Sequence, residues 1–326
     1  MAQVCVTGAT GFLGGALTRR LLSQDASVSA LARPSQRADR LEQSGARVVR
    51  GDLQQPAAIA EAVAGAEVVY HAAAMVEAPG DLGDFLDSNR GGTERVFQAA
   101  LQNGVRHIVY VSSIAVYGLV REGEVIDEST PFDPHPELRD SYAQSKIQAD
   151  GFAVDFAREN SAAARRLSVT IVRPGVIYGP GKPLPFGLLG FRAGKTSVIF
   201  GDRKNCVPLN YIENLVDAMQ CAAKASNPVA LRQYIVLDDE ALTLEQYHQA
   251  RKEVQGTSAL FFSGAPVLAT ARFAEAVHIV SAESGFSVLQ VERALQNRRY
   301  STARIRQELG WSPRVPLREA LRRSLP

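Results

Sequence analysis

Short apolar runs alternate with amphipathic stretches along the first half of the chain. The runs at residues 3–7, 27–32, 47–50, 67–71, 107–111 and 168–172 are rich in small and β-branched residues, which predicts buried strands. Apolar residues recur with helical spacing over 12–23, 85–103 and 141–158. Because each helix returns the chain to the same end of the sheet, this alternation predicts an α/β fold with a doubly wound parallel sheet.

The pattern changes after residue 173. Residues 174–205 are rich in Gly and Pro, which predicts loops and short elements. A helix over 213–224, a strand over 233–237 and a helix over 244–254 follow, and the tail 302–325 predicts two short helices around Trp311–Pro313. Residues 256–300 mix apolar clusters with isolated charges and predict no clear element.

Composition narrows the class of protein. The chain has 326 residues, a net charge of +2 and a 46% hydrophobic fraction, and it shows no basic stripe, so we expect no nucleic-acid partner. Cys5, Cys206 and Cys221 are scattered, which is typical of a reducing compartment and gives no metal spacing. No apolar run is long enough to span a bilayer. We expect a cytoplasmic enzyme without a metal.

The first strand runs directly into a glycine-rich turn and a helix start. Gly8 permits the tight turn, Gly11 lets the backbone approach a pyrophosphate, and Gly14 lets the helix pack closely on the strand. A strand, such a turn and a helix N-terminus together predict a dinucleotide site. The residues expected to contact the cofactor here are Gly8, Thr10, Gly11, Phe12, Leu13 and Gly14.

These observations predict a Rossmann fold with a second, smaller part. We expect residues 1–176 to form a dinucleotide-binding domain to which 206–238 return. Residues 177–205 and 239–326 would then form a substrate-binding lobe.

The end of the second predicted strand bears on the choice of cofactor. An NAD site places a carboxylate there for the ribose, whereas an NADP site places an arginine there for the 2′-phosphate. The chain has Arg33 at this point and no acid before Asp39, which favours NADP(H) over NAD(H). Asp52 and Leu53, after the third strand, are expected beside the adenine.

Tyr142 and Lys146 lie four residues apart at the start of a predicted helix, and therefore on one face of it. A neighbouring ammonium group, together with the positive nicotinamide ring, favours the phenolate, so we expect a lowered pKa for Tyr142 and a role as general acid/base. Lys146 is expected to hold the nicotinamide ribose as well.

With these motifs, several further segments complete a family pattern: His71-Ala72-Ala73, Asn89 to Thr93, Val111 to Gly118, Arg173 to Pro180, and Arg304 to Pro313. The chain thereby closely resembles an extended short-chain dehydrogenase/reductase of the NAD-dependent epimerase/dehydratase-like family. The resemblance implies Ser113, Tyr142 and Lys146 as catalytic residues. It also implies cofactor contacts from Ala72, Ala73, Asn89, Pro174 and Val176, and a homodimer formed through helices 85–103 and 141–158, whose outer faces we expect to carry Val96, Phe97, Ile147 and Phe152.

The motif style indicates a branch of that family. Ile114 and Ala115 stand where nucleotide-sugar dehydratases have an acidic pair, and Arg173-Pro174-Gly175 differs from the epimerase pattern. The chain is more similar to 3β-hydroxysteroid dehydrogenases and dihydroflavonol reductases. Arg203 lies near the place of a phosphate-binding arginine of the epimerases, so that alternative stays open.

We therefore expect an NADP(H)-dependent oxidoreductase that acts on a fairly apolar ketone or secondary alcohol. A nucleotide-sugar 4-epimerase with tightly held NAD and a non-catalytic dinucleotide sensor are the alternatives. Expected substrate contacts are Met75, Ser113, Tyr178 and Phe186. The wider apolar set adds Val76, Pro185, Leu188, Leu189, Phe261 and Phe262, with residues 266–280 as a possible lid.

Overall fold

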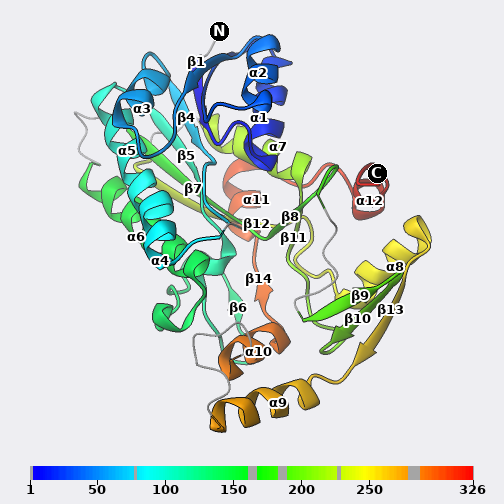
Figure 1. Ribbon diagram of the computed structural model, residues 1–326. Coiled ribbons are helices and arrows are strands. Elements are labelled where there is room, and N and C mark those ends of the chain that lie inside the picture. Colours follow the sequence, from blue (N-terminus) through cyan, green and yellow to red (C-terminus); the bar gives the residue numbers. More distant parts are fainter. Residues whose placement is uncertain are drawn as a thin grey trace.

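A seven-stranded sheet forms the centre of the protein in a computed structural model that describes residues 3–76, 79–160, 167–182, 189–225, 229–277 and 287–325 (Figure 1). Every neighbouring pair in this sheet is parallel. The strands, in their order across the sheet, are β12 (Leu231–Val236), β7 (Ser168–Pro174), β5 (His107–Val111), β4 (Val68–His71), β1 (Gln3–Thr7), β2 (Ser27–Ala32) and β3 (Arg47–Arg50).

Helices cover both faces of this sheet, because its central strands are apolar on both sides and must be shielded from water on each. Figure 1 shows two helix layers, one on each side. One layer contains α1 (Phe12–Leu22), α2 (Gln36–Gln43) and α7 (Ile212–Ala223), and the other contains α3 (Pro56–Val63), α5 (Gly92–Gln102) and α6 (Ser141–Glu159). The predicted doubly wound α/β fold is confirmed.

The strand order places a crevice at the carboxyl edge of the sheet. The chain runs outward from β1 through β2 to β3 and then resumes on the other side of β1 with β4. Ligands of doubly wound sheets bind where the order reverses, outside the carboxyl ends of the strands. Here that point lies between Thr7, which ends β1, and His71, which ends β4.

The helix predicted over 85–103 is three pieces in the structure: α4 (Leu82–Phe85), a π-helical stretch η1 (Leu86–Gly91) and α5. Asp81 begins the first piece with a capping box in which Asp81 and Asp84 each accept a hydrogen bond from the other's backbone N–H. The wide turn of η1 carries Asn89, whose side chain is buried. Apolar spacing alone does not distinguish a π-turn from an α-turn.

The remaining elements lie largely on one side of the carboxyl edge (Figure 1). A three-stranded sheet of β13 (Ser258–Phe262), β10 (Thr196–Phe200) and β9 (Gly190–Ala193) packs against α8 (Leu244–Gln255). Two short parallel pairs join β8 (Val176–Tyr178) to β11 (Leu209–Tyr211) and β6 (Val125–Ile126) to β14 (Arg299–Tyr300). The helices are α9 (Ala265–Ala276), α10 (Val288–Leu295), α11 (Ala303–Leu309) and α12 (Leu317–Arg323), and short 3₁₀ turns η2 (Ile114–Val116) and η3 (Pro136–Leu138) complete the described elements.

The faces of α5 and α6 differ in part from the expectation. Val96 and Phe97 are fully buried against the sheet, so they do not belong to an outer face. Ile147 is also buried, while Phe152 is partly exposed with the Arg90 guanidinium 4.1 Å from its ring centroid. In the described segments, no helix has the length and apolar character needed to cross a membrane.

Candidate active site

The glycine-rich turn between β1 and α1 leaves no room for side chains. A Cβ on Gly14 would lie 2.2 Å from the Gly8 carbonyl oxygen, and one on Gly8 would lie 2.7 Å from the Ala73 nitrogen. Gly8 also has φ +71°, a conformation that glycine adopts without strain. The turn therefore brings backbone N–H groups and the α1 N-terminus to the crevice, which fits the pyrophosphate of a dinucleotide.

A hollow of about 690 Å³ adjoins this turn at the ends of β2, β3 and β4. Arg33, Asp52, Leu53, Ala72 and Ala73 all line it, together with Gly8, Thr10 and Gly11. The Asp52 carboxylate accepts a hydrogen bond from the backbone N–H of Gln54 at 2.9 Å, which holds the side chain at the rim. The residues predicted for the adenosine end thus gather in one place.

A second hollow of about 870 Å³ lies on the other side of the turn and is strongly basic. Its cationic lining residues are Arg19, Arg20, Arg37, Arg40 and Lys182. Arg37 donates from Nη1 to the Thr10 carbonyl oxygen at 3.5 Å and so reaches the glycine-rich turn itself. Both Arg33 and Arg37 follow β2, but only Arg33 was predicted as a cofactor contact.

The expected catalytic residues meet in a third cavity, of about 460 Å³, at the ends of β1, β5 and β7. Ser113 enters from the turn after β5, Tyr142 and Lys146 from α6, and Pro174 and Val176 from the end of β7 and from β8. Gly8, Gly11, Phe12, Leu13 and Gly14 form its opposite wall. One cavity therefore joins the glycine-rich turn to the tyrosine–lysine pair.

The tyrosine and the lysine are held by different partners. A hydrogen bond links the Tyr142 and Ser113 side chains, and Ser113 Oγ accepts from the Ala115 N–H at 3.1 Å. Lys146 is buried and donates from Nζ to the Val111 carbonyl oxygen at 2.9 Å. The strand end of β5 thus positions the ammonium group, and the turn after β5 positions the phenol.

The expected lowering of the Tyr142 pKa is wrong for the chain's own groups. Burial raises the pKa of Tyr142, and the hydrogen bond with Ser113 offsets this only in part. Burial lowers the pKa of Lys146 to about 8, and the nearby Asp150 carboxylate opposes that shift. At neutral pH the phenol therefore carries its proton and the ammonium group remains charged.

Asp150 lies one helical turn after Lys146 and belongs to a buried network. Arg173, at the end of β7, donates from Nε and Nη2 to the two Asp150 carboxylate oxygens, each at 2.8 Å. Arg173 also donates to the Tyr117 hydroxyl at 2.8 Å and to the Gln233 side-chain oxygen at 2.6 Å. This guanidinium therefore ties α6 to β7, to β12 and to the segment after Ser113.

Asn89 does not line the cavity. Its Nδ2 donates to the Met75 carbonyl oxygen at 2.9 Å and to Ser145 Oγ at 2.8 Å, and its Oδ1 accepts from the Met75 N–H at 2.7 Å. Asn89 thereby joins η1 to α6 and to the segment after β4. His71 is equally internal: it is bonded to Thr7 and Thr93, and burial lowers its pKa to about 3.

Two of the expected substrate residues, Met75 and Tyr178, lie outside the wall of the catalytic cavity. Tyr178 is fully buried, and its ring packs 5.6 Å from that of Tyr211, so it makes no wall of the cavity. Met75 lines the adenosine-end hollow, whereas its neighbour Val76 lines both that hollow and the catalytic cavity. Phe186 lies outside the described residues, as do Pro185, Leu188 and the end of the expected lid.

The apolar residues predicted for the substrate lobe also lie outside the cavity wall. Phe261 packs against His248 with ring centroids 5.8 Å apart, while Phe262 is half exposed on the far side of the strand. Leu189 and α9 make no part of the described cavity wall. What the structure brings there instead is cationic: Arg139, Lys182 and Arg298, with Tyr300 beside them. The wall is otherwise mostly apolar, as expected, but it is formed by other residues than those predicted, among them Ile114, Ile177 and Pro208.

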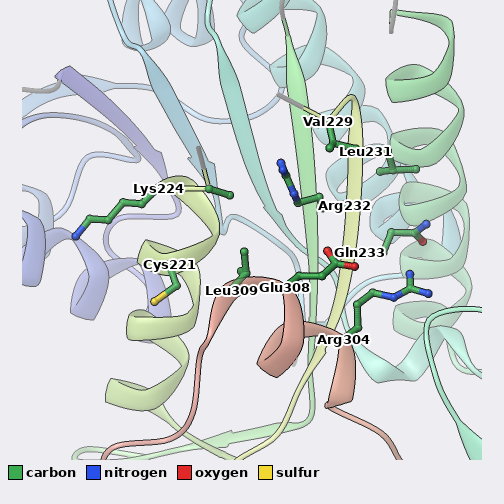
Figure 2. A pocket seen from close by; sticks show the side chains of 10 residues that line it. Cys221, Lys224, Val229, Leu231, Arg232, Gln233, Arg304, Glu308 and Leu309 are labelled. Carbon is green, nitrogen blue, oxygen red and sulfur yellow. The ribbon is translucent and has the colours of Figure 1, made fainter. Parts of the chain in front are cut away.

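One further hollow lies away from these, between β12, α7 and α11 (Figure 2). Lys224, Arg232 and Arg304 line it, but Figure 2 shows their charged ends pointing in different directions. They present no common point to a ligand, so this hollow adds nothing to the site. In the described part of the chain, no three His, Cys, Asp or Glu side chains are grouped to hold a metal.

Comparison with known proteins identifies the family. The model of the NAD dependent epimerase/dehydratase family matches residues 4–236, which span the sheet, the glycine-rich turn and the tyrosine–lysine pair. The chain belongs to this family. The resemblance to an extended short-chain dehydrogenase/reductase is thereby confirmed, and with it the expectation of a nicotinamide-dependent type of enzyme.

Individual relatives extend the comparison. The chain is 31% identical to a 2-alkyl-3-oxoalkanoate reductase from Shewanella oneidensis over 75% of its own length and 64% of the reductase. It is 27% identical to a 3beta-hydroxysteroid-dehydrogenase/decarboxylase from Arabidopsis thaliana over 85% of its length and 65% of that enzyme. The chain thus spans less than two thirds of either relative. A UDP-glucuronic acid 4-epimerase from Bacillus cereus, in complex with UDP-glucuronic acid and NAD, has the same fold, with a TM-score of 0.73, 17% identity, and coverage of 99% of this chain and 97% of the epimerase.

Proposed function

We propose that this protein is an NADP(H)-dependent oxidoreductase that interconverts a ketone and a secondary alcohol. The observation that carries the proposal is the shared cavity, in which Ser113, Tyr142 and Lys146 lie opposite the glycine-rich turn. A nicotinamide, when bound, supplies or accepts the hydride. The chain's own residues then have to hold the carbonyl oxygen, exchange one proton with it and exclude water.

The protonation states suit reduction. Because burial raises the pKa of Tyr142, the hydroxyl keeps its proton at neutral pH and can donate it to a carbonyl oxygen. Ser113, bonded to Tyr142, would donate a second hydrogen bond to the same oxygen. The charged Lys146 would stabilise the phenolate that forms as the proton leaves, and the walls at Ile114 and Ile177 would keep water away.

Two arginines support the choice of NADP(H). Arg33 lines the adenosine-end hollow, and Arg37 reaches the glycine-rich turn from the basic hollow next to it. A 2′-phosphate on the ribose would enter the space between them, where guanidinium groups bind phosphate in a two-pronged manner. The Asp52 carboxylate would accept a hydrogen bond from the adenine amino group at the other side of the hollow.

The similarity to relatives supports a ketone substrate. The Shewanella relative is named for a 3-oxoalkanoate, and the Arabidopsis relative for a hydroxysteroid.

The proposal also includes the division of the chain into a dinucleotide-binding domain (1–176 with 206–238) and a substrate lobe (177–205 and 239–326). It further includes a homodimer in the cytoplasm.

A nucleotide-sugar 4-epimerase is the second candidate. It is favoured by one observation, the cations Arg139, Lys182 and Arg298 in the cavity wall, because a diphosphate needs such groups. An epimerase would also use the tyrosine–lysine pair, but would keep its cofactor through the cycle.

The test is turnover with ketones. Purified protein with NADPH should oxidise the cofactor when given a hydrophobic ketone, and Tyr142→Phe should lower the rate about a hundredfold or more while NADPH still binds. Lys146→Ala should impair both binding and rate. Tight calorimetric binding of a UDP-sugar without turnover of any ketone would transfer the assignment to the epimerase, and full activity in Tyr142→Phe would remove the mechanism.

A further inference from the structure

Two buried arginines beside the catalytic cavity share one carboxylate. Arg139 and Arg293 are 8% and 5% exposed, and both bond Asp133 Oδ2, at 2.8 and 2.5 Å. Arg139 also donates from Nη1 to the Tyr117 carbonyl oxygen at 3.2 Å. Arg298, two residues before the Tyr300 that ends β14, lines the same cavity as Arg139. We call Arg139, Arg293, Arg298 and Tyr300 the arginine cluster.

The arginine cluster holds more hydrogen-bond donors than the described protein groups satisfy. Arg139 Nε, Arg293 Nε and Nη1, and the Tyr300 hydroxyl are buried without a partner among the described residues. A buried donor left unpaired destabilises the folded protein, and more so when it is charged. Arg139 and Tyr300 both line the catalytic cavity, so an acceptor bound there lies next to two of these side chains.

The charges of the arginine cluster do not balance either. Three arginines face two carboxylates, Asp133 and the Asp140 that caps α6, which leaves one positive charge in excess. Burial lowers the pKa of Arg293 to about 10, and the repulsion from Arg139 and Arg298 adds to this effect. A single negative charge on a ligand would compensate the excess.

The cluster lies close to the proton donor. Arg139 precedes Tyr142 by three residues, so their Cα atoms are at most roughly 11 Å apart. Since both side chains line the same cavity of about 460 Å³, an anion held by Arg139 and a carbonyl oxygen held by Tyr142 share one small space. That spacing suits a group near the ketone and not one at the far end of a long substrate.

We propose that the substrate is a keto acid, whose carboxylate is bound by Arg139, Arg298 and the Tyr300 hydroxyl while Tyr142 holds the ketone oxygen. The inference rests on the proposed reductase function and adds the chemical class of its substrate. The carboxylate takes no part in the redox step: the hydride adds to the ketone carbon, the Tyr142 proton goes to its oxygen, and the carboxylate is unchanged.

The test compares an acid with its ester. The probes are freshly prepared 3-oxooctanoate and ethyl 3-oxooctanoate, which share the ketone and the alkyl chain and differ in the charge. With NADPH, kcat/KM for the acid should exceed that for the ester at least tenfold. Arg298→Met should lower this acid-to-ester ratio about ten- to a hundredfold, as expected for hydrogen bonds to a charged group.

Arg299→Met is the matched control, because Arg299 is an exposed neighbour outside the cavity wall; it should leave the ratio unchanged. Binding of the product, 3-hydroxyoctanoate, followed by calorimetry with NADP⁺ present, gives a readout besides turnover and should weaken in Arg298→Met. If both ketones react equally well and Arg298→Met leaves the ratio as it is, the keto-acid inference is overturned and the reductase function stands. Should neither ketone react while UDP-glucose binds tightly, both fail together.

Discussion

Arg173 and Asp150 form a fully buried, two-pronged ion pair that joins the end of β7 to the helix of the tyrosine–lysine pair. The next residue after Arg173 is Pro174, which lines the catalytic cavity. The pair therefore fixes the wall expected to contact the nicotinamide relative to Lys146, one helical turn from Asp150.

Breaking this pair should be costly. Asp150→Asn leaves a buried guanidinium without its charge partner, which we expect to lower the free energy of unfolding by about 3–5 kcal/mol. Urea unfolding followed by circular dichroism measures the change. Asp155→Asn is the control, since Asp155 lies exposed on the same helix, and it should shift stability by less than about 0.5 kcal/mol. Equal effects of the two substitutions would contradict the role given to Asp150.

The pH profile should have a limb near pH 8. Because burial lowers the pKa of Lys146 to about 8, the folded chain loses the ammonium charge as pH rises through that value, so kcat/KM should fall above it. Lys146→Arg keeps the charge and should abolish that limb, at a lower overall rate. In the unfolded chain the lysine keeps its proton to about pH 10.4, so this residue's contribution to stability rises with pH between these values. An unchanged alkaline limb in Lys146→Arg would assign it to another group.

Cofactor preference should depend on two arginines and not on Arg33 alone. We expect wild-type protein to bind NADP(H) more tightly than NAD(H). Arg33→Ala and Arg37→Ala should each reduce that preference by about 1.5–3 kcal/mol, the range for hydrogen bonds to charged groups. Fluorescence titration with both cofactors measures this, with Arg47→Ala as a control because Arg47 is paired with Glu61 at the far end of β3. Tighter binding of NAD(H) by the wild type would refute the NADP assignment.

The proposed dimer should form through α5 and α6. Light scattering at micromolar concentration should give twice the chain mass of 35.2 kDa. Phe152→Asp should yield monomers, because it places a charge on the partly exposed face of α6. Phe191→Asp, on the half-exposed sheet of the lobe, changes an equally apolar side chain and should leave the dimer intact. A monomeric wild type would count against this arrangement.

The sequence predicted the central sheet well because its strands are continuous apolar runs. The bounds of β1, β2, β3 and β5 are those expected, and β7 continues two residues further to Pro174. It predicted the lobe poorly, because β13 and β14 are not continuous buried apolar runs and pair with strands distant in the sequence, β10 and β6. Such elements have little local signal, since tertiary pairing decides them.

The candidate site, like the fold, was predicted only in part from the sequence. Local motifs indicated the glycine-rich turn and the tyrosine–lysine pair, which the structure brings to one cavity. Arg298 and Tyr300 also line that cavity, but they lie more than 150 residues after the tyrosine–lysine pair. No motif or spacing in the sequence predicts that they contribute to the site. The burial of Tyr178 could not be predicted either, because its motif does not show which face of the strand the tyrosine occupies.

The π-helical turn η1 has a consequence for how tolerant this segment is to changes in length. Its six residues, 86–91, take up one residue more than an α-helical course would need. Deleting a single residue there would restore an ordinary α-helical turn, and α4 and α5 would keep their relative phase. Asn89 would lose the wide turn from which it bonds both Met75 and Ser145, so one extra residue sets whether the segment after β4 and the helix bearing Tyr142 stay joined.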